Sequence, residues 1–409
     1  MKPSTKAVLW VLWIIGAVVG GAGVFNRFAT GHADANYGSY IVWGLWVSAY
    51  IYYIGLSAGA FLLSSLIYVF GVKRLERVGK MALLVAIITL CMALLSIFFD
   101  LGREWRAYRV MTSPNFSSMM GWMVWLYTAY FLLLVAELWF ALRPDLARWA
   151  ARTDWRGAVG RLIARTNGPL SKAQEEDAHG WLRWLGTFGV PLAFTFHGGV
   201  GALLGTVEAR SYWHTPLMPI LFLVGALLSG GALMTFAVAA FWPNRDEAWR
   251  GTVRLLGKVV LGLIAFDLLL EWAEISIPLW YGVGHEADLM RRVLFGEYWY
   301  AFWIVHLLIG AVIPVCLLLF RGRSPFAVGL AGFLVVCTFL AVRLNMVVPG
   351  LVDPNLHELQ NAFTDHRLVF YYFPSFFEVQ VTLAMVAMGC AMFYLGYKFL
   401  PLTDERRTA

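Results

Sequence analysis

The sequence predicts an all-α integral membrane protein with ten transmembrane helices. Hydrophobic residues make up 60% of the 409 residues, charged residues only 14%, and the mean hydropathy is +0.67. One water-soluble core could not bury so much apolar surface, so the helices must be surrounded by a lipid bilayer. A helix crosses about 30 Å of hydrocarbon with roughly 20 apolar residues. We predict spans at 7–26, 39–70, 80–101, 119–142, 184–206, 215–242, 255–281, 298–320, 326–347 and 375–400.

The basic residues predict the orientation of these spans. With ten spans, both termini lie on one side, and the tails and loops of that side hold 23 of the 32 Lys and Arg residues. The positive-inside rule therefore places both termini in the cytoplasm. The net charge of +7 then reflects topology, and no nucleic-acid partner is expected. We predict a multi-pass protein of the prokaryotic cell (inner) membrane, surrounded by membrane lipids.

A weak internal repeat predicts how the spans are grouped. Ser57–Leu62 (SAGAFL) resembles Ser229–Met234 (SGGALM), 172 residues later. Chance similarity between helices rich in small residues is the competing interpretation. The repeat favours two four-helix bundles, spans 2–5 and 6–9, with spans 1 and 10 outside them. The predicted units are 1–38 (first span and outer loop), 39–206 (first bundle, with cytoplasmic loop 143–183), 207–347 (second bundle) and 348–409 (outer loop, tenth span and cytoplasmic tail).

Two loops are long enough to have a role of their own. Loop 143–183 carries arginines four or five residues apart with interleaved Trp and Leu. This pattern is compatible with an amphipathic helix on the inner membrane surface, or with a solvated basic loop. Loop 348–374 is the longest on the outer side, and it is a candidate docking surface for a partner.

Three acids on span 7 indicate a proton path. Asp267, Glu271 and Glu274 are four and then three residues apart, which places them on one helical face. Buried together, they would repel each other unless one is protonated or a base lies beside them. A polar seam that only holds helices together is the alternative. We predict a proton path from residues within or at the edge of spans: Asp267, Glu271, Glu274, His306, Arg343 and Glu378.

Polar residues toward the outer side indicate a quinone site. Asp100 and Arg103 lie at the outer end of span 3, and His197 lies in the outer half of span 5. A quinone headgroup needs hydrogen-bond partners and an exchangeable proton, which carboxyl and imidazole groups supply. An interfacial Asp100–Arg103 ion pair and a satisfied core histidine are the alternatives. We assign catalytic roles to Asp100 and His197, with Arg103 and Trp43 as further quinone-binding residues.

Metal cofactors are not expected in this chain. His197 and His306 lie at matching depths, so they are formally able to be the two ligands of a b-type haem, but the proposed bundles separate them. The four cysteines lie in spans and form no CxxC pair, whereas iron–sulfur clusters need clustered thiolates. We therefore expect no haem, no iron–sulfur cluster and no other metal site.

An ordered series of motifs resembles the NrfD/PsrC family, the polysulfide-reductase-type membrane subunits, in its ten-helix branch. The motifs are Trp43–Trp46 (WGLW), Gly55–Phe61 (GLSAGAF), Asp100–Arg103 (DLGR), Pro114–Met119 (PNFSSM), His197–Gly201 (HGGVG), Trp213–Pro216 (WHTP), Arg343–Asn345 (RLN) and Tyr372–Ser375 (YFPS) with Glu378. The resemblance covers nearly the whole chain. It implies a haem-free subunit that binds menaquinone or ubiquinone near the outer side of the first bundle.

The resemblance also implies partners. They are a ferredoxin-like iron–sulfur subunit on the outer face and, behind it, a molybdopterin or other catalytic subunit. The predicted function is electron exchange between membrane quinone or quinol and that iron–sulfur subunit, within a respiratory oxidoreductase complex and with possible coupling to proton translocation. A secondary transporter is the alternative, because repeats and intramembrane acids fit that class too.

Overall fold

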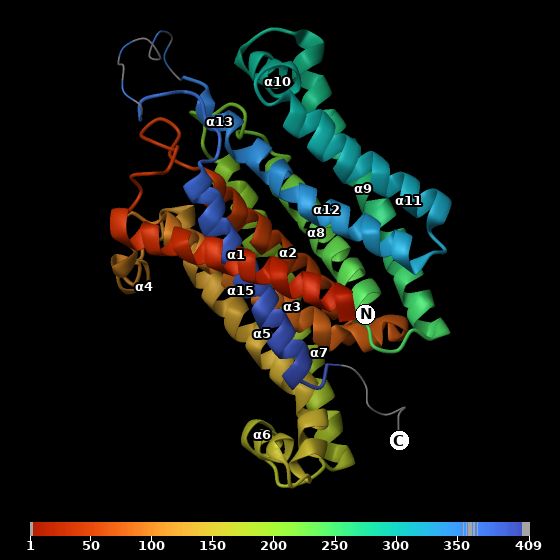
Figure 1. Cartoon of the computed structure of the whole chain (residues 1–409). Helices are drawn as coiled ribbons and strands as arrows, with labels where there is room; N and C mark the ends of the chain where they lie inside the picture. Colours follow the sequence, from red (N-terminus) through yellow and green to blue (C-terminus); the bar gives the residue numbers. More distant parts are fainter. Residues whose placement is uncertain are drawn as a thin grey trace.

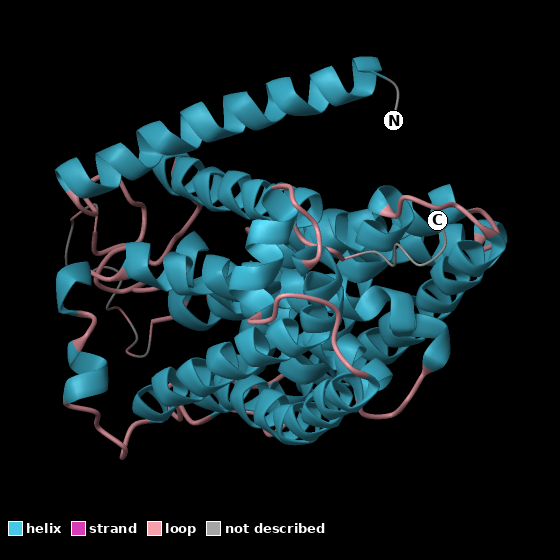
Figure 2. Ribbon diagram, turned by 90° about the horizontal axis from the view of Figure 1, so that it is seen from below, coloured by secondary structure: helices cyan, strands magenta, loops and turns pink. Residues whose placement is uncertain are grey.

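The computed structural model describes residues 3–354, 356, 358, 362, 365 and 367–402, and this part of the chain consists of helices and connecting loops without a strand (Figures 1 and 2). The long helices are α1 (Pro3–Thr30), α2 (Leu45–Tyr68), α3 (Gly79–Asp100), α5 (Met119–Ala150), α7 (Lys172–Gly205), α8 (Met218–Phe241), α9 (Glu247–Tyr281), η3 (Ala301–Val312) continued by α11 (Ile313–Arg321), α12 (Pro325–Val347) and α15 (Phe376–Phe399). The short ones are η1 (Lys73–Val78), η2 (Glu104–Arg106), α4 (Arg109–Thr112), α6 (Trp155–Ala164), α10 (His285–Phe295) and α13 (Pro349–Val352).

The prediction of a multi-pass, all-α membrane protein is confirmed. Among the described residues, nine helices are long and apolar enough to cross a bilayer, and each coincides with a predicted span. The remaining predicted span, 255–281, lies within the 35-residue helix α9. Asp267, Glu271 and Glu274 interrupt its apolar sequence, which explains why α9 is not among the nine. Below, the "outer end" and "inner end" of the molecule are the ends predicted to face the exterior and the cytoplasm.

Helices α2 and α8 cross at the centre of the molecule. Almost every residue of α2 is buried, against α3, α7, α8 and α12. At the crossing, a Cβ atom on Gly59 would lie 2.1 Å from the carbonyl oxygen of Ala226 and 2.8 Å from the Cα of Gly230. Both glycines belong to the repeated motifs, so the two motifs contact each other directly. Without a side chain at either position the backbones approach closely, as small residues permit between membrane helices.

The other helices pack around this central pair. α3, α5 and α7 pack with α2 or with one another, whereas α9, α11, α12 and η3 pack with α8 or with one another. α1 pairs with α15 outside both groups, and Figure 2 shows α1 along one edge of the molecule. This grouping follows the predicted spans 2–5, 6–9, 1 and 10. The sequence boundaries of the four units remain a prediction, and tail residues 403–409 lie outside the described residues.

Segment 143–183 is largely helical. α5 continues to Ala150, α6 covers Trp155–Ala164, and α7 begins at Lys172. The small residues Gly157 and Gly160 of α6 are buried, and Gly160 lies against the backbone of α5. The indole of Trp139 donates to the carbonyl of Ile163 at 2.9 Å. α6 therefore packs as a cap on the inner end of α5, at the lower end of Figure 1.

The eighth predicted span has an unusual backbone. Residues Ala301–Val312 form a twelve-residue π-helix, and α-helical geometry returns at Ile313, immediately before Pro314. Proline has no N–H group and its ring clashes with the carbonyl four residues earlier, so it disturbs the preceding turn of an α-helix. π-helical segments occur frequently at functional sites. His306 lies in the middle of this segment and is buried.

The crossing of α2 and α8 predicts a strong effect of substitution at Gly59. We expect Gly59→Val to lower the melting temperature of the detergent-purified protein, because overpacking typically costs about 1–3 kcal/mol. Gly262→Val is the matched control, since a Cβ at Gly262 meets no atom within 4 Å. Equal melting temperatures for both variants would contradict the close contact.

Candidate functional site

Two clusters of described ionisable residues contain most of the predicted site residues, and the first lies at the outer end of α1 and α3. We call the group formed by Arg27, His32, Tyr37, Asp100 and Glu378 the outer cluster. Nδ1 of His32 and the hydroxyl of Tyr37 share a short hydrogen bond. Nε2 of His32 lies 3.4 Å from the carbonyl oxygen of Leu101. Both rings contact the ring of the buried Trp46, with centroids 5.9 and 6.0 Å away.

Asp100 is the last residue of α3, and one of its carboxyl oxygens has no partner. Oδ1 of Asp100 is buried and makes no hydrogen bond within the described part of the chain. The charged side chains that interact electrostatically with Asp100 are Glu378 and Arg27. Arg103 has an exposed side chain, and it forms no ion pair with Asp100 in the described part of the chain. Oδ1 of Asp100 is therefore a buried polar atom whose hydrogen-bonding capacity is unsatisfied.

Arg27 holds the end of α3 in place. Its Nε donates to the carbonyl of Phe99 at 2.7 Å, and its Nη2 donates to the carbonyl of Leu101 at 2.6 Å. Glu104 lies 3.6 Å from the same Nη2. Carbonyls in the last turn of a helix lack intrahelical partners, and a cation there also meets the negative end of the helix dipole. Arg27 is thus a C-terminal cap of α3 that positions Asp100.

The histidine and tyrosine of the outer cluster lie in the loop after α1 and are both held neutral. Burial, together with the charge of Arg27, lowers the pKa of His32. Burial, together with Asp100 and Glu378, raises the pKa of Tyr37 well above its usual value. Near neutral pH, Tyr37 therefore keeps its proton and donates to Nδ1 of His32. Nε2 of His32 is then the protonated nitrogen and points its N–H at Leu101.

Glu378, predicted for the proton path, lies in the outer cluster instead of beside the acids of α9. It is residue N3 of a capping box at the start of α15, with Ser375 as the N-cap. Its Oε2 accepts from the backbone N–H of Ser375 at 2.9 Å and of Asn36 at 3.1 Å. Its Oε1 accepts from the hydroxyl of Tyr372 at 2.5 Å. These bonds tie the loop after α1 to α15 and leave Glu378 well satisfied.

The second polar site joins the two bundles, and we call it the bridging network. Nε2 of His197 lies 2.8 Å from the carbonyl oxygen of Phe222, and Nη2 of Arg343 donates to the same oxygen at 3.3 Å. Nε2 must therefore carry the proton, and the buried Nδ1 has no partner in the described chain. The guanidinium of Arg343 also lies over the rings of Phe222 and Phe339, 4.7 and 5.0 Å from their centroids.

Arg343 connects His197 to the acids of α9. Asp267 is buried and interacts electrostatically with Glu271, His306 and Arg343. Oε2 of Glu271 lies 2.8 Å from Nε2 of His306. The structure therefore brings together five predicted residues, but it pairs His197 with the second bundle and not with Asp100. The bridging network consists of His197, Asp267, Glu271, His306 and Arg343, joined through the carbonyl of Phe222.

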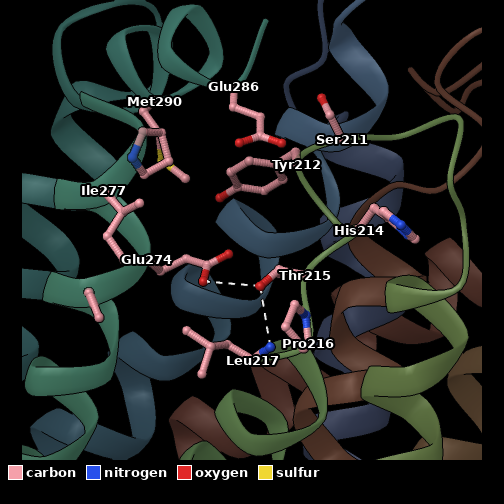
Figure 3. A pocket seen from close by; sticks show the side chains of 12 residues that line it. Ser211, Tyr212, His214, Thr215, Pro216, Leu217, Glu274, Ile277, Glu286 and Met290 are labelled. Carbon is pink, nitrogen blue, oxygen red and sulfur yellow. Dashed lines mark hydrogen bonds between the residues drawn. The ribbon is translucent and has the colours of Figure 1, made fainter. Parts of the chain in front are cut away.

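Glu274, the third acid of the α9 stripe, faces a cavity at the outer end. The cavity has a volume of about 320 Å³ and lies between α9, α10 and the loop before α8. Oε2 of Glu274 accepts from the hydroxyl of Thr215 at 3.4 Å. In Figure 3 the oxygens of Glu274, Tyr212 and Glu286 lie around the same space, whereas His214 points away from it. Of the three acids of the stripe, only Glu274 lines this cavity, and neither Asp100 nor His197 lines it.

Trp43 lies apart from the outer cluster. Its ring stacks on that of Trp213, with centroids 5.6 Å apart and planes at 22°. The indole of Trp213 donates to the carbonyl of Met346. Trp43 thus packs on the loop before α8 and the end of α12. His32 and Tyr37 were missed by sequence reasoning because they lie in a polar loop; the signal that could have led to them is Arg27, a charge in the last turn of helix α1, directly after the predicted span 7–26.

The histidines considered as haem ligands have separate partners. Nε2 of His197 binds the carbonyl of Phe222, whereas Nε2 of His306 binds Glu271. Coordination of one iron by both Nε2 atoms would require both bonds to break. Among the described residues, no group of three or more His, Cys, Asp and Glu side chains is arranged to hold a metal ion.

This architecture defines a class: a multi-pass, all-α membrane protein with buried ionisable groups at its outer end and between its two helix groups. The sequence of residues 34–355 matches the model of the family described as "Polysulphide reductase, NrfD". The chain belongs to the polysulphide reductase NrfD family.

Curated relatives extend this similarity over most of the chain. A selenate reductase subunit of Mesobacillus selenatarsenatis is 34% identical, covering 96% of this chain and 93% of the relative. A putative dimethyl sulfoxide reductase membrane subunit of Halobacterium salinarum is 29% identical over 88% of this chain and 83% of its own length. An Hdr-like menaquinol oxidoreductase integral membrane subunit of Archaeoglobus fulgidus is 26% identical, with coverages of 90% and 86%.

The bridging network predicts that Arg343 contributes to stability through charge. We expect Arg343→Met to lower the melting temperature of the purified protein clearly, because the carbonyl of Phe222 loses a charged donor and the buried Asp267 loses a nearby positive charge. The double variant Arg343→Met/Asp267→Asn should recover part of this loss, since the uncompensated carboxylate is gone. A double variant whose loss equals the sum of the two single losses would show that the two groups are not coupled.

Proposed function

We propose that this chain is the quinone-exchanging membrane subunit of a multi-subunit respiratory oxidoreductase. Membership of the NrfD family supports a role as membrane subunit of a reductase complex. Relatives named as subunits of a selenate reductase and of a menaquinol oxidoreductase support a redox role linked to quinol. In this proposal the protein exchanges electrons between membrane quinone or quinol and an iron–sulfur subunit docked at the outer end. The quinone is menaquinone or ubiquinone.

The observation that carries the proposal is the unpartnered oxygen of Asp100 beside the His32–Tyr37 pair. Oδ1 of Asp100 is buried without a hydrogen-bond partner among the described residues. A quinone oxygen or quinol hydroxyl would supply that partner, so the donor set fits such a headgroup. Trp46, which is fully buried, packs against the rings of His32 and Tyr37 and keeps them in position. The headgroup site is therefore proposed at the outer cluster.

In this site the chain's own residues handle protons. A bound quinone supplies a carrier of two electrons and two protons. Asp100 accepts a proton from a quinol hydroxyl when ionised and donates one when protonated. Arg27 keeps Asp100 in position by capping α3. The Tyr37–His32 hydrogen bond gives a second proton-carrying link toward the loop after α1, and thus toward the outer surface.

The outer loop between α3 and α5 is proposed to take part in docking the iron–sulfur partner. Trp105 is 75% and Tyr108 59% exposed, and the exposed Arg103, Arg106 and Arg109 surround them. Aromatic and arginine side chains are enriched at protein interfaces. The loop adjoins Asp100 directly in sequence, so a partner bound there would lie beside the proposed headgroup site. A molybdopterin or other catalytic subunit would then bind that partner.

The bridging network is proposed to conduct protons through the second bundle. Glu271 and His306 share a hydrogen bond at the π-helical segment, and Glu274, one turn further along α9, faces the outer cavity. The acids lie on one face of α9, and together with His306 of the neighbouring π-helical segment they form a series of groups that can accept protons. His197 extends the series to the first bundle through Phe222 and Arg343. In this proposal His197 therefore belongs to the proton path, and Asp100 belongs to the separate headgroup site.

Asp100→Asn tests the headgroup site in the intact complex. We expect quinol-coupled turnover to fall about 10²-fold, because the amide cannot exchange the proton. Turnover of the catalytic subunit with a soluble artificial electron donor or acceptor should stay unchanged. Tyr37→Phe should lower quinol-coupled turnover as well, with a smaller effect.

Asp34→Asn is the matched control, because Asp34 lies in the same loop as Tyr37 and is exposed. Wild-type quinol turnover in Asp100→Asn, in a complex that assembles normally, would refute the proposed site. Loss of turnover with the soluble donor as well would point to a failure of assembly.

Glu271→Gln and Glu274→Gln test the proton path. We expect each to abolish proton translocation by the complex in proteoliposomes, measured with a pH-sensitive dye, while quinol oxidation continues in the presence of an uncoupler. Neutralising either acid interrupts the series of proton acceptors on α9. Asp288→Asn on the exposed face of α10 is the control. Parallel loss of both activities in the Gln variants would argue against a dedicated path.

A further inference from the structure

A second cavity lies at the inner end of the molecule, far along the helices from the outer cluster. It has a volume of about 650 Å³ and lies between the inner part of α9, the end of α11 and the start of α12. Figure 1 shows these helices side by side at one edge of the molecule. Four basic side chains line it. They are Arg254 and Lys258 from α9, and Arg321 and Arg323 from the turn between α11 and α12.

Among the described residues, an acid balances only one of the four positive charges of this inner groove. Glu247 is the acid nearest to these cations, and it lies 3.7 Å from Arg254 and 3.3 Å from Arg250. Lys258, Arg321 and Arg323 form no ion pair with any described residue, and Nε of Arg254 is buried without a partner. Clustered cations without counter-charges favour an anionic ligand.

The start of α12 adds to the positive field. Ser324 lines the groove and is the N-cap of this 23-residue helix, whose first turn holds no acidic residue. Free N–H groups and the helix dipole make such an end favourable for a phosphate oxygen. The first helical residue is Pro325, which has no N–H, and the N–H groups of Ala327 and Val328 already bond to Ser324, so the donor left for a ligand is the N–H of Phe326.

The groove is also bordered by exposed apolar side chains. Leu319 and Phe320 line it and are 59% and 80% exposed, and Phe326 just beyond it is 80% exposed. Leu261 completes an apolar wall on α9. A free inorganic anion would leave these surfaces uncovered, whereas nucleic acid would gain nothing from an apolar wall at membrane depth. A molecule with an anionic head and apolar chains matches both surfaces at once.

We propose that the inner groove binds an anionic phospholipid of the cytoplasmic leaflet. Arg321, Arg323 and Lys258 hold the phosphate oxygens, and the start of α12 contributes the N–H of Phe326 and the positive end of its dipole. The acyl chains lie along Leu319 and Phe320. Two basic residues on each side of the groove suit a headgroup with two phosphates, so cardiolipin is expected to bind more tightly than phosphatidylglycerol. The site is independent of the proposed quinone function.

Lipid binding to the delipidated, intact complex tests this inference. Thermal-shift and native mass-spectrometry measurements would use cardiolipin, phosphatidylglycerol, phosphatidylcholine and inorganic phosphate as separate probes. We expect saturable stabilisation by cardiolipin, weaker stabilisation by phosphatidylglycerol, and none by phosphatidylcholine or by inorganic phosphate. Arg321→Gln/Arg323→Gln should weaken cardiolipin binding at least tenfold, because two of the four charges are lost.

Lys172→Gln/Arg183→Gln is the matched control. It removes two exposed cations of α7 at the same predicted side of the membrane, outside the groove. Equal cardiolipin affinity in the two double variants would overturn the site. Equal stabilisation by inorganic phosphate would replace the lipid by a simple anion. If Arg321→Gln/Arg323→Gln fails to assemble, Lys258→Gln alone should still weaken binding, and an unchanged affinity there would equally refute the proposal.

Discussion

A charge buried among membrane helices cannot be solvated by water, so the protein itself must supply its polar partners. Arg343 shows how this protein meets that constraint. Its side chain is 1% exposed, and its partners come from three different helices. Its hydrogen-bond partners are the carbonyl of Phe222 on α8 and a sulfur of α12 itself, and the acids of α9 act on its charge from a longer distance. Satisfying this one guanidinium therefore requires α8, α9 and α12 to meet at one level, which fixes their relative depth in the second bundle.

The same constraint connects the bundles. The carbonyl of Phe222 accepts from His197 of α7 as well as from Arg343, so one backbone group joins the first bundle to the second. Just inward, Gly59 and Gly230 bring α2 and α8 into backbone contact. Close packing and shared polar contacts thus act at the same interface. His197 of the first bundle and Arg343 of the second bundle are therefore connected through one backbone oxygen.

The outer cluster is organised differently, because it is built at helix ends and in loops. Arg27 satisfies the last carbonyls of α3, and Glu378 satisfies the first N–H groups of α15 and of the loop after α1. Their bonds hold His32, Tyr37 and Asp100 near one another with a carboxyl oxygen left unpartnered. The bonds at the helix ends thus set the positions of the side chains from which the headgroup site is proposed.

The sequence by itself determined the membrane-spanning, all-α class, because long apolar runs are a local property of the chain. Helical periodicity is also local, and it placed Asp267, Glu271 and Glu274 on one face. Only the tertiary structure decided which residues meet. Asp100 and His197 both lie toward the outer ends of their helices, yet they belong to separate sites with different charged neighbours. Depth along a helix follows from residue number, but the direction in which a side chain points depends on how each helix is rotated against its neighbours. That rotation is set by packing contacts, such as the glycine crossing of α2 and α8, between segments far apart in the chain.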